Sequence, residues 1–106
     1  MNKPLLIGAG ELLWDMLPDG KQLGGAPANF AWHASQLGRQ GVVYSAVGAD
    51  QLGSEIVDLL NKKRMDTRFI SRLEEYPTGR VDVQIDSSGV PEYTIQTNVA
   101  WDKIPL

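Results

Sequence analysis

The stretch "LGGAPANFAWHASQLG", residues 23–38, places two glycines, a proline and an asparagine at the start of a segment with helical spacing. Pro27 suits the first turn of a helix, where its missing N–H has no partner to lose, and Gly38 is typical of a helix end. Asn29, just inside the helix, is not needed for a turn. Apolar residues recur at three- and four-residue intervals and predict one buried helix face: Phe30, Ala31, Ala34 and Leu37.

The residues before this helix have two interpretations. Gly24 and Gly25 lack a Cβ atom, so a ligand can approach their backbone closely. The Asn29 side chain offers both a donor and an acceptor, which suits a hydroxyl that does the same. A plain turn followed by a helix with an asparagine in its first turn explains the same residues, and the stretch alone leaves both open.

Asp15 is a charged residue inside an apolar run, "LLWDML" at 12–17. A carboxylate among apolar side chains needs a partner or access to water. Asp15 is therefore either on the solvated face of a strand or an acceptor for adjacent hydroxyls of a polyol. The stretch does not choose between these alternatives.

Short apolar runs and helical segments alternate on both sides of residues 23–38. The runs at 4–10, 42–47 and 67–73 predict buried strands. Asp50 is a good N-cap for a second helix, whose apolar face is marked by Leu52, Ile56, Leu59 and Leu60. The order strand, helix, strand, helix, strand predicts an α/β fold with a parallel sheet.

The other segments have the alternation of strands with one apolar face. Residues 11–17 predict a strand that ends in a turn at 18–20, where proline, aspartate and glycine follow one another. Residues 80–86 and 92–97 predict a hairpin across a Ser-Ser-Gly turn. We expect this hairpin to lie beside the parallel sheet as a flap.

Composition excludes several classes of function. The 106 residues carry a net charge of −3, with no basic patch for nucleic acid and no apolar run that would suggest a membrane span. There is no cysteine, and His33 is the one histidine, which excludes thiolate and histidine-rich metal sites. We expect His33 to be packed or solvated, and the chain to be a cytoplasmic protein without a signal peptide.

The glycines of "GAGELL", 8–13, permit a nucleotide-binding interpretation. A dinucleotide fingerprint needs a third glycine and a helix after it, but Pro18 and Gly20 soon interrupt any helix here. An oxidoreductase with a nucleotide-binding strand–helix–strand unit therefore rests on this one stretch. Glycines at a crowded strand end are the favoured interpretation.

Taken together, four motifs in this order resemble the ribokinase-type (PfkB) carbohydrate kinases, and most of all their fructokinase branch. They are G-x-G-E-x-x-x-D, G-G-A-P-A-N-x-A, L-G and V-G-x-D-x-x-G, and the resemblance runs over 4–102. It implies the N-terminal part of a ribokinase-like three-layer α/β/α fold with a small β lid. Residues 4–10 and 24–75 would form the α/β part, and 11–23 and 78–98 the lid.

The resemblance also implies a site and a reaction. Asp15 would accept a sugar hydroxyl, Gly24 and Gly25 would line the sugar pocket, and Asn29 would hydrogen-bond a sugar hydroxyl. Members of the family transfer the γ-phosphoryl group of ATP to a sugar hydroxymethyl, with Mg²⁺. The expected substrate is a small sugar, with fructose favoured. In many relatives the lid pairs two subunits, so we expect a homo-oligomer through the lid or the open sheet edge.

This chain departs from the family pattern in one decisive way. The second family signature, D-T-x-G-A-G-D, supplies the catalytic base and a helix N-terminus for the transferring phosphate, and it does not occur here. "GADQLG", 48–53, lacks the second glycine. We therefore expect an N-terminal kinase fragment that is inactive alone and binds ATP and Mg²⁺ poorly. The alternative is a non-catalytic sugar-binding or dimerisation module of the same ancestry.

Overall fold

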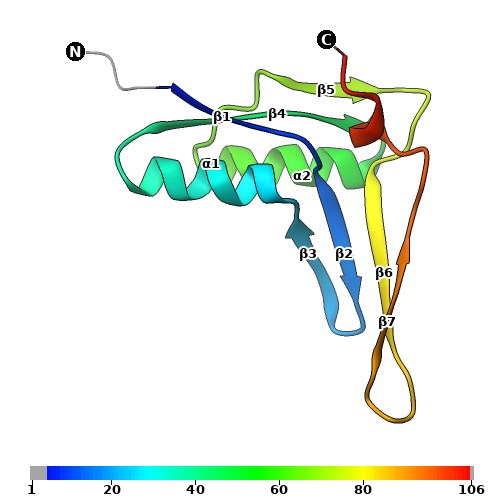
Figure 1. The fold of residues 1–106 in the computed structure, drawn as a ribbon. Coiled ribbons are helices and arrows are strands. Elements are labelled where there is room, and N and C mark those ends of the chain that lie inside the picture. The colour runs from blue at the N-terminus through cyan, green and yellow to red at the C-terminus, as the bar shows by residue number, and fades with distance from the viewer. Residues whose placement is uncertain (1–4, 106) are drawn as a thin grey trace.

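The computed structural model describes residues 5–105, and the side chains of all of these except 26–28. A three-stranded parallel sheet, in the order β1-β4-β5, carries two helices on one face (Figure 1). Its elements are β1 (Leu5–Ala9), α1 (Ala26–Gln36), β4 (Gln40–Gly48), α2 (Gln51–Lys62) and β5 (Ile70–Leu73). The predicted strand–helix order and parallel sheet are confirmed.

A second sheet of four strands projects from the carboxyl end of β1, and we call it the lid (Figure 1). Its order is β3-β2-β6-β7, and its strands are β2 (Leu13–Leu17), β3 (Gly20–Gly24), β6 (Gly79–Ile85) and β7 (Pro91–Ile95). The predicted hairpin joins the predicted 11–17 strand through parallel pairing of β6 with β2. A short 3₁₀ helix, η1 (Ala100–Lys103), follows the lid.

Small residues bring α1 unusually close to β4. A Cβ atom added to Gly41 would lie 2.1 Å from the Ala31 carbonyl oxygen, so only glycine fits beneath this helix. Ala31 and Ala34 are buried as predicted, but Phe30 and Leu37 are 48% and 81% exposed. The prediction that they share the buried face was wrong, because a helix seated this tightly on its alanines turns the flanking large side chains outward.

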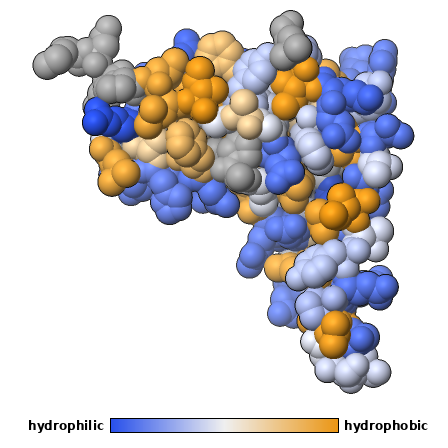
Figure 2. Space-filling model, viewed as in Figure 1, coloured by the Kyte–Doolittle hydropathy of each residue, from blue (hydrophilic) through white to orange (hydrophobic). Residues whose placement is uncertain are grey.

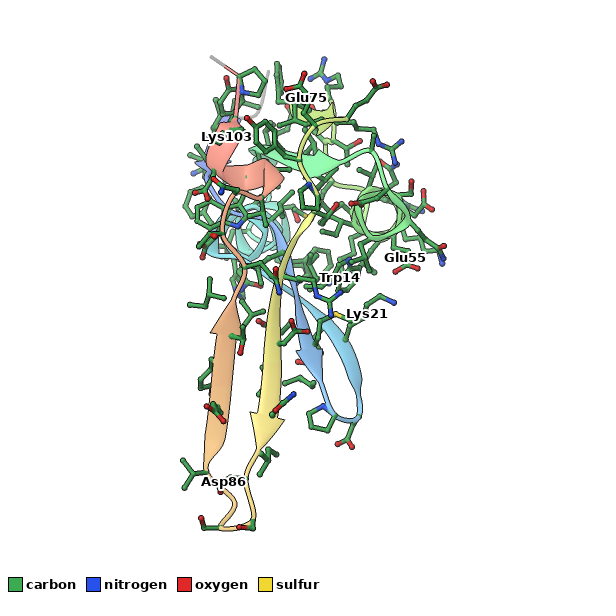
Figure 3. All side chains as sticks on the ribbon, turned by 90° about the vertical axis from the view of Figure 1, so that its right-hand side faces the viewer. Trp14, Lys21, Glu55, Glu75, Asp86 and Lys103 are labelled. Atoms are coloured by element: carbon green, nitrogen blue, oxygen red, sulfur yellow. The ribbon has the colours of Figure 1, made fainter. Side chains whose placement is uncertain are left out.

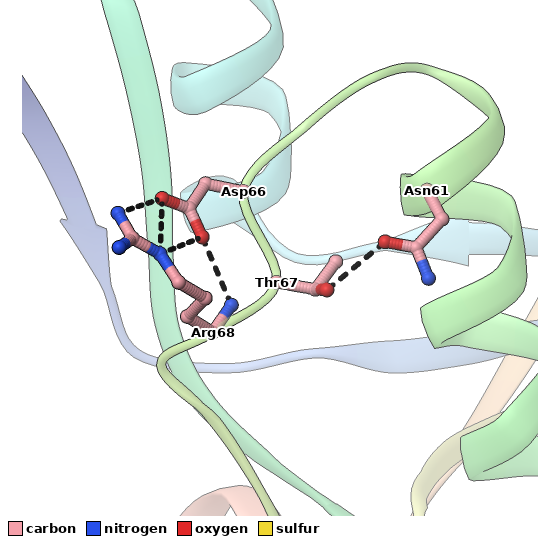
Figure 4. A network of polar contacts seen from close by, with 4 residues as sticks. All are labelled: Asn61, Asp66, Thr67 and Arg68. Carbon is pink, nitrogen blue, oxygen red and sulfur yellow. Dashed lines mark hydrogen bonds and ion pairs between the residues drawn. The ribbon is translucent and has the colours of Figure 1, made fainter.

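The predicted strand at 67–73 begins three residues late. The Asp66 carboxylate accepts hydrogen bonds from the Arg68 backbone N–H, at 3.0 Å, and from the Arg68 guanidinium, and Thr67 donates to Asn61 (Figure 4). An aspartate that bonds to the backbone two residues on forms a local turn. This turn interrupts the pairing with β4: Asp66 makes an isolated parallel bridge with Val42, and the continuous β4–β5 ladder begins only at Ile70.

Asp50 ties the two sheets together. Its Oδ1 accepts from the Gly53 N–H, at 2.8 Å, and from the Thr78 hydroxyl, at 2.6 Å, while its Oδ2 accepts from the Thr78 N–H at 3.0 Å. Thr78 Oγ1 in turn accepts from the Gly48 N–H at 2.8 Å. The predicted N-cap is confirmed, and the same carboxylate also holds the residue just before lid strand β6.

Apolar side chains remain uncovered on both sheets. Figure 2 shows hydrophobic surface on the side of β1 and in patches along the lid. Leu5 and Ile7 are about half exposed on β1, which lies at one edge of its sheet. On the lid, the predicted hairpin is present, and its apolar residues pair across the strands, with Val81 opposite Ile95 and Val83 opposite Tyr93. Most of this apolar face is solvent-exposed rather than packed: Ile85 58%, Tyr93 63% and Ile95 67%.

Candidate functional site

The candidate site lies where the parallel sheet meets the lid. Parallel α/β sheets bind ligands at the carboxyl ends of their strands. Here β1 ends at Ala9, and the chain passes through 10–12 directly into lid strand β2. No helix follows the glycines of "GAGELL" among the described residues, so the dinucleotide-binding interpretation loses the helix N-terminus on which it depends.

The structure brings Asp15 and Gly24 together. They lie on neighbouring lid strands, and Asp15 is partly buried. Asp15 shares one face of β2 with Leu13, which is the residue directly opposite Gly24 on β3. A Cβ atom added to Gly24 would stand 2.7 Å from Asp15 Oδ2, so the carboxylate lies directly over the bare glycine backbone. Because Gly24 has no side chain, the Asp15 carboxylate can occupy the space above it.

Gly25 links the lid to helix α1. Its φ is +112°, a conformation that side-chain-bearing residues rarely adopt, and an added Cβ would lie 2.3 Å from the Glu11 carbonyl oxygen. Gly25 is also the N-cap of α1, and its carbonyl accepts from the Asn29 N–H at 3.4 Å. Asn29 thus sits one turn into α1 with an exposed side chain.

The region contains two polar side chains, Asp15 and Asn29, whose hydrogen bonds decide whether a ligand could bind to them. Among residues 5–105, neither the Asp15 carboxylate nor the Asn29 amide makes a side-chain hydrogen bond to another described residue. A carboxylate acceptor beside bare glycine backbone and an amide in the first turn of α1 are each able to hydrogen-bond a hydroxyl. Within the described residues, no hydrogen bond joins the Asp15 and Asn29 side chains.

Sequence reasoning missed Gln22 as a neighbour of this site. Gln22 lies directly opposite Asp15 on β3, and residues directly opposite in an antiparallel pair share a face. Strand β3 itself was not predicted, because Gly20, Lys21 and Gly24 have low strand propensity. The one available signal was the Pro-Asp-Gly turn at 18–20, after which a returning strand could have been expected.

Replacing Gly24 with alanine is expected to displace the Asp15 carboxylate. The new Cβ would contact the end of a flexible side chain, so Asp15 can rotate away, and we expect the free energy of unfolding to change by less than about 1 kcal/mol. Loss of the carboxylate from its place should lower sugar affinity roughly tenfold. Calorimetric sugar titration and urea unfolding of the variant measure the two effects.

A matched Gly89→Ala variant, at the β6–β7 turn, controls for general loss of glycine. Nothing lies within 4 Å of an added Cβ at Gly89, although its φ of +82° is strained for alanine. Unaltered sugar affinity in Gly24→Ala, or an equal loss in Gly89→Ala, would contradict the placement of Asp15.

Within residues 5–105 there is no group of three carboxylate or imidazole side chains that could hold a metal ion. The exposed Arg68 side chain is paired with the largely covered Asp66 carboxylate, and the hydrogen bonds from the Arg68 guanidinium lower the pKa of the Asp66 carboxyl.

The resemblance to carbohydrate kinases is borne out by comparison with known proteins. The model of the "pfkB family carbohydrate kinase" matches residues 17–103. The Pyrococcus horikoshii protein PH1459 is 34% identical over 113 residues, covering 96% of this chain and 36% of that protein. Fructokinase-2 of Oryza sativa subsp. japonica is 30% identical over 112 residues, covering 94% and 33%.

Solved structures agree in fold. The crystal structure of PH1459, described as an uncharacterized sugar kinase, superposes with a TM-score of 0.79 at 36% identity, covering 92% of this chain and 36% of that one. The apo fructokinase of Vibrio cholerae O395 gives 0.82 at 25% identity, covering 91% and 35%. The chain spans about a third of the length of the relatives it matches, and the predicted ribokinase-like fold class is confirmed. No helix among the described residues is long and apolar enough to cross a membrane. By its sequence and its fold, this chain belongs to the pfkB family of carbohydrate kinases.

Proposed function

We propose that this chain is the sugar-binding portion of an ATP-dependent carbohydrate kinase that phosphorylates a sugar hydroxymethyl. The observation that carries this proposal is the Asp15 carboxylate on lid strand β2, which lies over Gly24 and makes no side-chain hydrogen bond to another described residue. Asp15 accepts hydrogen bonds from sugar hydroxyls, the backbone of Gly24 and Gly25 admits the sugar closely, and Asn29 binds a further hydroxyl. Fructose is the favoured sugar, because several relatives are named fructokinases.

The division of labour follows from the chemistry of phosphoryl transfer. That reaction needs a positioned base and fixed positive groups around the transferring phosphate. The described residues supply hydroxyl-binding groups but no metal cluster. A relative of known structure is in complex with ATP. The proposal is that the remainder of a family chain supplies the phosphate side of the site, while residues 11–23 and 78–98 close over the sugar.

A phosphotransfer assay tests this proposal. A kinase that contains residues 1–106 and the remainder of a family chain is expected to convert ATP and fructose to ADP and a fructose phosphate, whereas the 106-residue chain alone is expected to be inactive. Fructose-dependent ADP release by the 106-residue chain that persists through repurification would overturn the assigned division. A complete kinase that ignores every hexose and pentose would overturn the proposal as a whole.

The exposed apolar surfaces support a second part of the proposal, self-association through the lid or the open β1 edge. Exposed Ile95, Tyr93 and Ile85 form one face of the lid, and apolar faces of this kind mark contact surfaces. Strand β1 also presents an unpaired edge, which favours pairing with another chain. We commit to the lid face as the surface between two copies.

Introducing a charge on this face is expected to separate the copies. Wild-type chain should show a light-scattering mass about twice the 11.6 kDa of one chain, and Ile95→Lys should return it to that of one chain. Thr94→Lys is the matched control, because Thr94 is also exposed but projects from the opposite face of β7. A monomeric wild type, or equal dissociation by both variants, would contradict association through the lid face.

A further inference from the structure

The lid is attached to helix α2 on the side opposite the candidate site. The Trp14 indole N–H donates to the Leu52 carbonyl at 2.9 Å, and the Trp14 side chain is only 5% exposed. Figure 3 shows Trp14 at the base of the lid, on the side facing α2. This hydrogen bond joins residues 38 positions apart. If β2 moved away from α2, the indole N–H and the Leu52 carbonyl would both lose their hydrogen-bond partner, so the bond holds β2 in its orientation against α2.

Lys21 and Glu55 reinforce this attachment. Lys21 Nζ lies 2.8 Å from Glu55 Oε2 and 5.3 Å from the centre of the Trp14 ring (Figure 3). Gln51 Nε2 donates to the other oxygen of Glu55 at 3.2 Å. Both charged side chains are about two-thirds buried, and Glu55 Oε2 itself is shielded from solvent. The ion pair therefore joins β3 to α2 at the wall of a cavity of about 610 Å³ that Trp14, Lys21 and Glu55 help to line.

Strand alternation couples this attachment to the candidate site. Successive side chains of a strand point to opposite faces, so Trp14 on one face fixes the neighbouring Asp15 on the other. The same holds on β3, where Lys21 precedes Gln22, the residue directly opposite Asp15. Whatever sets the angle between the lid and α2 thus sets where the Asp15 carboxylate points.

We propose that Trp14, Lys21 and Glu55 form a clamp that positions Asp15 for sugar binding. The three are positioning residues, since they lie behind the lid and none faces the sugar. The inference rests on the proposed sugar site for its effect on affinity, but the clamp itself is a property of the lid without ligand. Breaking the clamp should loosen the lid against α2 and move Asp15 off the sugar.

Charge reversal and exchange test the ion pair. Backbone amide resonances of the 106-residue chain are followed during titration with fructose. Lys21→Glu and Glu55→Lys are each expected to weaken fructose binding about fivefold, and the double exchange to restore it to within about twofold, since the pair is then re-formed. Asp58→Lys is the matched control: Asp58 is exposed, lies near Glu55 on α2 and forms no ion pair within the described residues, so its reversal should leave affinity unchanged.

The same spectra without sugar separate this inference from the sugar site. Each single reversal should shift the Asp15 and Gly24 amides, and the double exchange should return them. If the wild-type chain fails to bind fructose, the proposed sugar site is wrong. The amide shifts measured without sugar still show whether the clamp positions Asp15. Should a reversal fail to fold, Glu55→Gln and Trp14→Phe provide the same comparison. Single variants that leave these amides unmoved, or an exchange no closer to wild type than the singles, would overturn the clamp.

Discussion

Replacing Asp50 with alanine is expected to lower the free energy of unfolding of this chain by about 3 kcal/mol. The substitution removes a helix N-cap, which contributes about 1 kcal/mol, and hydrogen bonds from Thr78 to a charged acceptor, which contribute roughly 1.5–3 kcal/mol. It also leaves the buried Thr78 hydroxyl without the acceptor 2.6 Å away. Urea unfolding followed by circular dichroism measures the loss.

Two variants show that the effect belongs to the Asp50 connection. Asp58→Ala removes a carboxylate from the exposed side of the same helix and should change stability by less than about 0.5 kcal/mol. Thr78→Val keeps the shape of residue 78 but removes its hydroxyl, so it should reproduce a large part of the Asp50→Ala loss. An Asp50→Ala chain as stable as Asp58→Ala would show that the carboxylate does not join the two sheets.

The pH dependence follows from the same contacts. Burial raises the pKa of Asp50, but the hydrogen bonds from Thr78 and Gly53 and the nearby Arg72 lower it by more, so the pKa lies below its ordinary value of 3.8. The folded state therefore favours the ionised carboxylate. Its stabilisation is fully present above pH 3.8 and declines as pH falls below that value toward the folded-state pKa. The stability difference between wild type and Asp50→Asn should shrink over that range.

Replacing Asp15 with asparagine is expected to raise the sugar KM of a complete kinase containing these residues by roughly 10- to 100-fold. A carboxylate–hydroxyl hydrogen bond contributes about 1.5–3 kcal/mol. The isosteric amide has an NH₂ group in place of one charged oxygen, and this group cannot accept the hydrogen bond that a sugar hydroxyl donates. The KM for ATP should stay within about twofold, because in the proposed site Asp15 contacts the sugar and not the nucleotide. Steady-state assays with fructose and ATP varied separately measure both constants.

Asp19→Asn is the control for Asp15→Asn. Asp19 is an exposed carboxylate in the β2–β3 turn, four residues along the same hairpin, and its replacement should leave both KM values unaltered. An Asp15→Asn enzyme with normal sugar KM and normal turnover would remove Asp15 from the sugar site. An equal rise in both KM values would place Asp15 in a structural role.

Most of the architecture could be predicted from local patterns in the sequence. Strand–helix alternation, the Gly38 helix end and the Asp50 cap each depend on a few neighbouring residues, and all are present in the structure. The lid hairpin was predictable for the same reason, since Val81, Val83 and Ile85 alternate cleanly. The order of the motifs in the sequence predicted the family, and the family model that matches residues 17–103 confirms it.

What the sequence left unpredicted depends on contacts between distant segments. The exposure of Phe30 and Leu37 follows from the fit of Ala31 onto Gly41, which no helical period encodes. The contact of Asp15 with Gly24 needs β3, whose residues have low strand propensity. The Trp14–Leu52 bond joins residues 38 positions apart and has no sequence signature at all.

Amide resonances of the 106-residue chain, recorded during titration with fructose up to about 100 mM, test the central claim most directly. This range detects binding as weak as roughly −1.4 kcal/mol. We expect saturable shifts grouped at Asp15, Gly24, Gly25 and Asn29, and their loss in Asp15→Asn. Resonances that do not move with fructose or any other small sugar, or that move equally in Asp15→Asn, would contradict a sugar site at this junction of sheet and lid.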